Sequence, residues 1–189
     1  MSIRQALLTL LEEEPMYGYQ LRSEFEARTG ATWPLNVGQV YTTLTRLERD
    51  GLVEPAGTDD EGHAYYALTD AGRAEVRRWF TSPVERDRPP RDELAIKLAL
   101  AVTVPGVDVH AVIQAQRTDT LRALQEYTRL KAGATDEDLA WLLVLDALVF
   151  QAEAEVRWLD HCESRLARHA RPALRPSPKA SDTKGVGAR

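Results

Sequence analysis

Apolar residues recur at helical spacing in three short segments at the start of the chain. The first segment covers residues 2–15, the second 17–30 and the third 36–51. In the third, spacings of four and then three residues place the apolar side chains on one face of a helix. These apolar side chains are Val40, Leu44 and Leu47.

A β-hairpin is predicted directly after these helices. Residues 52–53 begin one arm, 57–62 form the turn, and 63–68 return with aromatic and apolar residues suited to a pleated surface. Thr69 then caps a fourth helix. The order helix, helix, helix, hairpin, helix is that of a winged helix-turn-helix domain, whose third helix enters the major groove of DNA.

The third predicted helix has a polar face opposite its apolar stripe. Amides there suit adenine, guanidinium groups suit guanine or phosphate, and threonine offers a hydroxyl and a methyl group that packs on thymine. Tyr41 lies beside the apolar stripe, where it can either pack or place its hydroxyl on a phosphate. The predicted DNA-contacting residues are Gln39, Tyr41, Thr42, Thr43, Arg46, Arg49 and His63.

Three stretches of this region resemble the PadR family of transcriptional regulators. They are MYGYQL at 16–21, GQVYTTLTRLERDGLVE at 38–54 and YYALTDAGR at 65–73, and RDELAIKLALA at 91–101 resembles the family's first carboxy-terminal helix more weakly. The resemblance implies a homodimeric regulator, usually a repressor, that binds an inverted repeat. Regulators of this family are often released from DNA when a small molecule binds.

The hairpin tip departs from that family pattern. It carries Asp59, Asp60 and Glu61, where PadR-like proteins commonly have Arg or Lys. Through Ser82 the chain has eight Lys and Arg residues against thirteen Asp and Glu residues, although phosphate neutralisation usually requires a basic domain. Two functions therefore stay open: an operator-binding regulator with modest nonspecific affinity, and a winged-helix module that contacts proteins without binding an operator.

The rest of the chain is predicted to be helical, with three helices at about residues 94–104, 109–131 and 135–168. Prolines and charges indicate a linker at residues 83–92 between a DNA-binding domain at 1–82 and a helical dimerisation domain at 93–170, with a disordered tail at 171–189. The fold class is thus mainly α with one short two-stranded hairpin. The last helix has an apolar stripe that is predicted to pair with a second copy, and an intramolecular bundle is the alternative. The stripe contains Leu139, Leu142, Leu145, Val149, Val156 and Leu159.

The composition is that of a soluble cytoplasmic protein. The chain has 189 residues, 43% of them hydrophobic and 28% charged, and no apolar run of eighteen residues that could span a membrane. Cys162 is the single cysteine, so neither an intrachain disulfide nor a thiolate metal cluster is expected. Because no catalytic or phosphate-binding motif is present, we expect neither an enzyme nor a cofactor.

Three tryptophans are candidates for an effector pocket. In PadR-like proteins such a pocket often lies where the winged domain meets the dimerising helices, and flat side chains there could stack on a small aromatic effector. Ordinary core packing is the alternative for each of them. The candidates are Trp33, Trp79 and Trp141.

Overall fold

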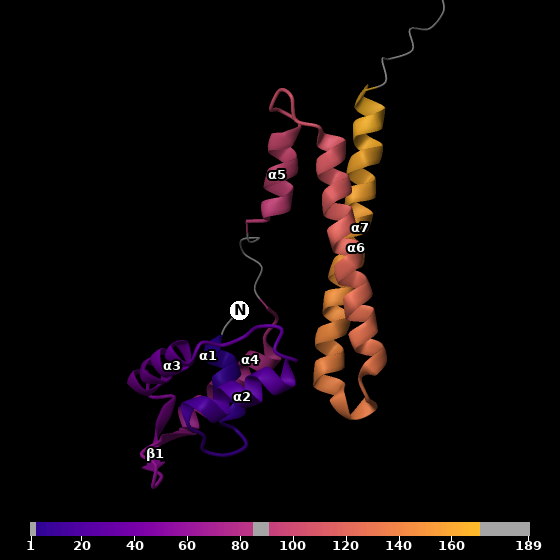
Figure 1. The fold of residues 1–189 in the computed structure, drawn as a ribbon. Coiled ribbons are helices and arrows are strands. Elements are labelled where there is room, and N and C mark those ends of the chain that lie inside the picture. Colours follow the sequence, from indigo (N-terminus) through magenta and orange to yellow (C-terminus); the bar gives the residue numbers. More distant parts are fainter. Residues whose placement is uncertain (1–2, 85–90, 171–189) are drawn as a thin grey trace, which may run out of the picture.

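The computed structural model describes residues 3–84 and 91–170, which form a winged-helix domain followed by a helical domain (Figure 1). The predicted fold class is confirmed. The predicted tail and most of the predicted linker lie outside the described residues. The elements are α1 Ile3–Leu10, α2 Gly18–Arg28, α3 Val37–Arg49, β1 Val53–Thr58, β2 Ala64–Leu68, α4 Asp70–Thr81, α5 Glu93–Ala101, α6 Val109–Gly133, a 3-10 turn Asp136–Asp138, and α7 Leu139–Ala170.

One hydrophobic core joins α1, α2, α3, α4 and the hairpin. The apolar stripe predicted for α3 is fully buried in it, as are Leu7 and Leu8 of α1 and Leu21 of α2. Val53 and Leu68 bring the base of the hairpin into the same core, and Val76 does so for α4. Because each element buries a face in this core, the rotation of α3 about its axis is fixed by packing.

The hairpin of β1 and β2, which we call the wing, is antiparallel and pairs Val53 with Leu68. Its register shifts between Pro55 and Thr58. On its other side, β2 exchanges two backbone hydrogen bonds of 3.1 Å between Tyr66 and Met16, in the loop before α2. The wing is therefore tied by its backbone to the start of α2.

Helix α4 approaches the base of the wing very closely at Gly72. A methyl group on this residue would lie 2.1 Å from the carbonyl oxygen of Leu52 and 2.8 Å from Cδ2 of Leu68. Only a residue without a side chain allows this approach. The contact gives a physical reason for the glycine in the TDAG stretch.

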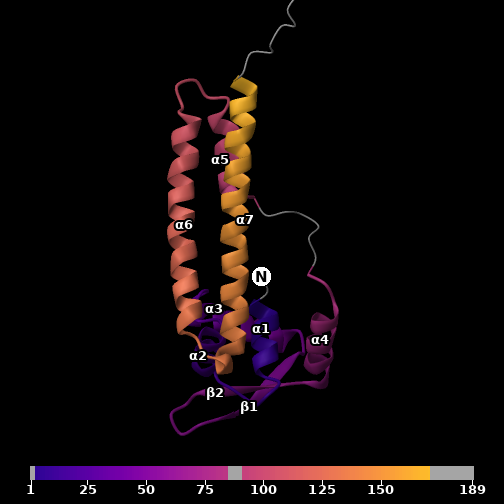
Figure 2. The same ribbon diagram turned by 90° about the vertical axis from the view of Figure 1, so that its right-hand side faces the viewer.

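The carboxy-terminal helices α6 and α7 form a long antiparallel hairpin, with α5 packed at its open end (Figures 1 and 2). Leu98 of α5, Ile113 of α6 and Leu159 of α7 form a common core. On the same hairpin, Arg117 lies 2.7 Å from both Asp160 and Glu163. The predicted helices are all present, and none of the helices in the described residues is both long and apolar enough to span a membrane.

The stripe on α7 that was predicted to meet a second copy is partly covered within the chain. Leu145 and Leu159 are fully buried in the helical domain of the single chain, whereas Leu142, Val149 and Val156 are half-buried. The intramolecular alternative therefore accounts for part of the stripe. A helical pattern shows which face is buried but does not distinguish a neighbouring helix from a partner subunit.

Candidate nucleic-acid interface

The amino-terminal end of α3 is capped and its polar face is exposed. Asn36 accepts a 2.7 Å hydrogen bond from the backbone amide of Gly38, which satisfies one of the free amides of the first turn. Because the apolar stripe is buried, the side chains opposite it point to solvent. They form a shallow polar depression lined by Ile3, Asn36, Gly38, Gln39, Thr42, Thr43 and Arg46.

The two predicted arginine contacts differ in their surroundings. Arg46 is exposed and forms no ion pair with any of the residues described here. Arg49 lies 3.1 Å from Asp50, and the other oxygen of this carboxylate lies 2.6 Å from Arg4 of α1. Hydrogen bonds from Arg4 and then Arg49 lower the pKa of Asp50. The end of α3 therefore presents two cations around one anion.

Arg4 was not predicted as part of this surface. It is 46 residues away from Asp50 in the sequence, and no local pattern links the two. The contact depends on α1 crossing the end of α3, which only the packed structure shows.

The threonines of α3 use their hydroxyl protons within the helix. Thr42 donates to the carbonyl of Gly38 at 2.7 Å, and Thr43 donates to that of Gln39 at 2.7 Å. Thr45 makes the same type of bond to Tyr41 at 3.0 Å. These hydroxyls are left with lone pairs to offer DNA, alongside their methyl groups.

Tyr41 packs instead of standing free. It is half-buried against the amino-terminal core, and its ring lies across Gly18 of α2. Of the two alternatives for this residue, packing is the one that its surroundings favour.

The tip of the wing is organised around Asp59. One oxygen of its carboxylate accepts hydrogen bonds from the backbone amides of Glu61 at 3.0 Å and His63 at 2.8 Å. The other oxygen lies 2.9 Å from Nδ1 of His63. The backbone amide of His63 is the main cause of a lowered pKa at Asp59. One of the three acids at the tip thus closes the turn, while Asp60 and Glu61 stay exposed.

His63 is engaged with α2 as well as with the turn. Its ring stacks on Tyr17 with centroids 4.6 Å apart, and Tyr17 also meets Tyr65 edge-on at 5.3 Å. The side chain is only 32% exposed. The residue predicted to place a cation on DNA thus holds the wing against the start of α2.

The chain combines a winged-helix domain, in which the polar face of α3 is exposed, with an α-helical hairpin. Each of these two parts matches a model of known regulators. Residues 7–78 match the model of the transcriptional regulator PadR-like family, and residues 90–167 match the model named virulence activator alpha C-term. Over residues 7–78 the chain belongs to the transcriptional regulator PadR-like family. Its members are transcriptional regulators and not enzymes.

Two relatives are similar to the chain over nearly their full lengths. The probable transcriptional regulator Rv1176c of Mycobacterium tuberculosis is 28% identical over 185 residues, covering 88% of this chain and 98% of the relative. The negative transcriptional regulator PadR of Bacillus subtilis is 26% identical over 171 residues, covering 84% and 93% respectively.

Solved structures of other regulators share the fold. Bacillus subtilis PadR in complex with operator DNA has a TM-score of 0.64 and 21% identity, covering 88% of this chain and 97% of that chain. The same protein in complex with p-coumaric acid has a TM-score of 0.66 and 23% identity, with the same coverage. The Vibrio cholerae virulence activator AphA has a TM-score of 0.64 and 23% identity, covering 89% and 100%.

The tryptophans predicted to form an effector pocket in this PadR-like chain do not share one site. Trp33 is exposed, and Trp79 is exposed beside Phe80, with ring centroids 4.9 Å apart. Trp141 is half-buried against Gly30, where a methyl group would lie 2.4 Å from its ring. None of the three lines the groove of about 650 Å³ or the cavity of about 230 Å³ in the helical domain.

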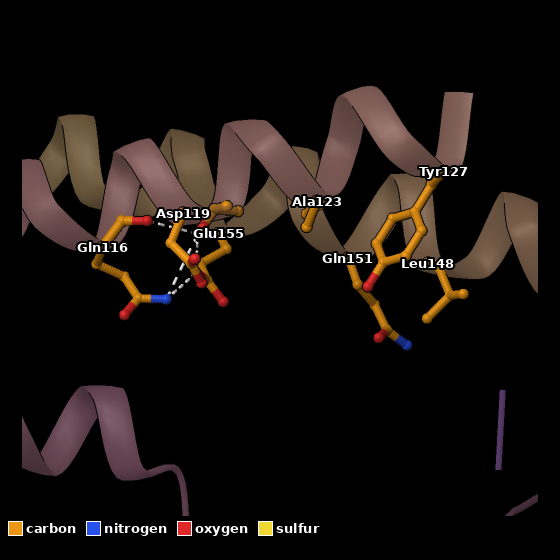
Figure 3. A pocket seen from close by; sticks show the side chains of 9 residues that line it. Gln116, Asp119, Ala123, Tyr127, Leu148, Gln151 and Glu155 are labelled. Carbon is orange, nitrogen blue, oxygen red and sulfur yellow. Dashed lines mark hydrogen bonds between the residues drawn. The ribbon is translucent and has the colours of Figure 1, made fainter. Parts of the chain in front are cut away.

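Several cavities lie in the described part of the helical domain, and two of them bear on effector binding. An apolar groove of about 650 Å³ runs between α5, α6 and α7 and is lined by Trp158, the tryptophan that the sequence did not suggest as an effector site. A more polar cavity of about 230 Å³ lies between α6 and α7. In Figure 3, Gln116, Asp119 and Glu155 gather at one end of it, and the ring of Tyr127 stands at the other.

Proposed function

We propose that this PadR-like regulator is a sequence-specific repressor that acts as a homodimer on an inverted-repeat operator. The observation that carries the proposal is the row of Gln39, Thr42 and Arg46 on α3, at spacings of three and four residues. The row faces solvent because the opposite stripe is fully buried. Amide, threonine and guanidinium groups are the side chains that read base edges in the major groove.

Homodimer formation is supported by apolar surface that the single chain leaves exposed. Helix α5 is apolar at seven of its nine positions, and its Ile96 and Leu100 are about half exposed. A helix that is apolar all round is normally buried. On α7, Leu139, Leu143 and Phe150 share one face and are each more than 60% exposed.

This outer face of α7, with α5, is the interface that we propose. Of the half-buried members of the predicted stripe, Leu142 and Val149 lie beside this face and Val156 lies farther round the helix. Leu145 and Leu159 stabilise the single chain from within. Two copies would place two α3 helices on half-sites about 34 Å apart and double the set of base contacts.

The acidic wing points to a particular way of docking. Asp60 and Glu61 would meet a phosphate backbone unfavourably, and His63 is occupied by Asp59 and Tyr17. We infer that the wing tip stays away from the phosphates and that α3 makes most of the operator contacts. Arg4 joins Arg46 and Arg49 as a contact because it lies at the same end of α3.

Repression is supported by the name of the Bacillus subtilis relative, a negative transcriptional regulator. Binding to the promoter of the protein's own gene tests the proposal in a mobility-shift experiment. A tight, salt-sensitive shift that Arg46→Ala weakens by about tenfold or more is the expected result. If the chain were a protein-interaction module, no shift would appear at any salt concentration.

We further propose that a small aromatic effector binds in the polar cavity between α6 and α7. Asp119 and Glu155 bring two carboxylates to it, and Tyr127 supplies a ring for stacking. Among the residues that the structure describes, no Lys or Arg lines it. Glu155 is held in place by Gln116 at 2.9 Å and Thr120 at 2.5 Å. A single-ring amine fits this lining better than a phenolic acid, because the carboxylates attract an ammonium group and repel an acid.

A regulator of this kind must reach the DNA, so we infer that it works in the cytoplasm.

A further inference from the structure

Thr42 occupies the centre of the exposed face of α3. At about 100° per residue it lies almost directly opposite the buried stripe, with Gln39 one turn before it and Arg46 one turn after it. Thr43, by contrast, is half-buried, and Thr45 lies to one flank. Thr42 is therefore the threonine that would approach the floor of the major groove most closely.

The side chain of Thr42 is oriented by a hydrogen bond inside the helix. Its hydroxyl donates to the carbonyl of Gly38 at 2.7 Å, a bond that selects one of the two rotamers open to threonine in a helix. The proton is thus unavailable to groups that only accept hydrogen bonds. Phosphate oxygens and the N7 and O6 atoms of guanine are such acceptors.

What Thr42 retains for DNA is a methyl group and the lone pairs of its oxygen. The methyl group matches the 5-methyl group of thymine, which is the one apolar feature in the major groove. Gln39 and Arg46, one turn before and one turn after Thr42, would bond the edges of adenine and guanine. These bonds would hold the methyl group of Thr42 over the base that lies between the two.

We propose that Thr42 reads a thymine in each operator half-site through its methyl group, with the hydroxyl serving to orient the side chain. This inference rests on the proposed function, because it assumes that α3 enters the major groove. It names one base of the operator that the protein selects.

Removing the thymine methyl group tests this contact directly. A duplex that the full-length protein selects from a random library is remade with uracil in place of thymine at one position of each half-site at a time. Burial of one methyl group corresponds to about fourfold in affinity, so about fifteenfold is expected when both half-sites change at the critical position. Uracil at other positions should have little effect.

Two substitutions separate the methyl group from the hydroxyl. Thr42→Ser removes the methyl group and should bind the thymine duplex as weakly as the unmodified protein binds the uracil duplex, with no preference between the two. Thr42→Val keeps methyl groups and should retain the preference for thymine. Thr128→Ser on α6 is the matched control, because Thr128 makes the same bond, to Leu124 at 2.7 Å, away from α3.

The outcomes distinguish this inference from the function on which it rests. Tight binding that is equal for thymine and uracil at every position overturns the role of Thr42 and leaves operator binding intact. Loss of the thymine preference in Thr42→Val also overturns it, because the hydroxyl would then be the reading group. Failure to select any duplex overturns the proposed function and this inference together.

Discussion

The ring of Tyr41 lies across Gly18 so closely that a methyl group on residue 18 would sit 2.6 Å from Cζ of the tyrosine. This contact fixes how α3 lies on α2. It also gives a physical reason for the glycine in MYGYQL and the tyrosine in GQVYTTL, two stretches that are far apart in the sequence.

Gly18→Ala should destabilise the protein by about 1–3 kcal/mol, because the added methyl group overpacks the contact between α2 and α3. Alanine normally stabilises a helix relative to glycine, so a decrease in the free energy of unfolding would point to the overpacked contact. Gly133→Ala at the end of α6 is the control, because nothing lies within 4 Å of the added methyl group there. Urea unfolding of both variants measures the difference, and equal stability of the two would contradict the packing.

Reversing charge at the wing tip tests where the wing lies on DNA. Asp60→Lys with Glu61→Lys should change operator affinity less than about threefold at physiological salt, because charges beyond about 8 Å are largely screened. Fluorescence anisotropy on the selected duplex measures the affinity. A gain of tenfold or more would mean that the wing approaches the phosphates.

The proposed dimer interface is tested by placing a charge on the outer face of α7. Phe150→Glu should give particles with the mass of one 21.2 kDa chain where the unmodified protein gives two, and it should lose tight operator binding. Light scattering after gel filtration measures the mass. Phe80→Glu on α4 is matched in exposure, at 65% against 67% for Phe150. It should remain a dimer, and a dimeric Phe150→Glu would place the interface elsewhere.

The negative charge lining the cavity between α6 and α7 predicts which ligands release the protein from its operator. Tyramine should lower operator binding and p-coumaric acid should not, because the described lining of the cavity includes Asp119 and Glu155 and neither lysine nor arginine. Asp119→Asn is expected to weaken the tyramine response several-fold while leaving operator affinity unchanged. Isothermal titration measures the two ligands directly, and tighter binding of p-coumaric acid would rule out this assignment of the cavity.

Much of the fold follows from the sequence because it depends on local patterns. The spacing of Val40, Leu44 and Leu47 determines both that α3 forms and which face it exposes. The apolar pattern also predicts the wing and the three carboxy-terminal helices.

The sequence could not show contacts made between distant residues. Arg4 meets Asp50 across 46 positions. The covering of Leu145 within the chain depends on how α6 and α7 pair. Likewise, the sequence could not show that Trp33, Trp79 and Trp141 lie at separate places in the structure.

The central claim is that the exposed face of α3 reads the operator. The most direct test is the operator affinity of the unmodified protein and of Arg46→Ala, measured by fluorescence anisotropy. The selected duplex and a scrambled duplex are compared over a range of salt concentrations. We predict selective binding that Arg46→Ala weakens by about tenfold or more, as expected for the loss of a base or phosphate contact. Equal binding of both duplexes, or an unchanged affinity in Arg46→Ala, would contradict reading of the operator by this face of α3.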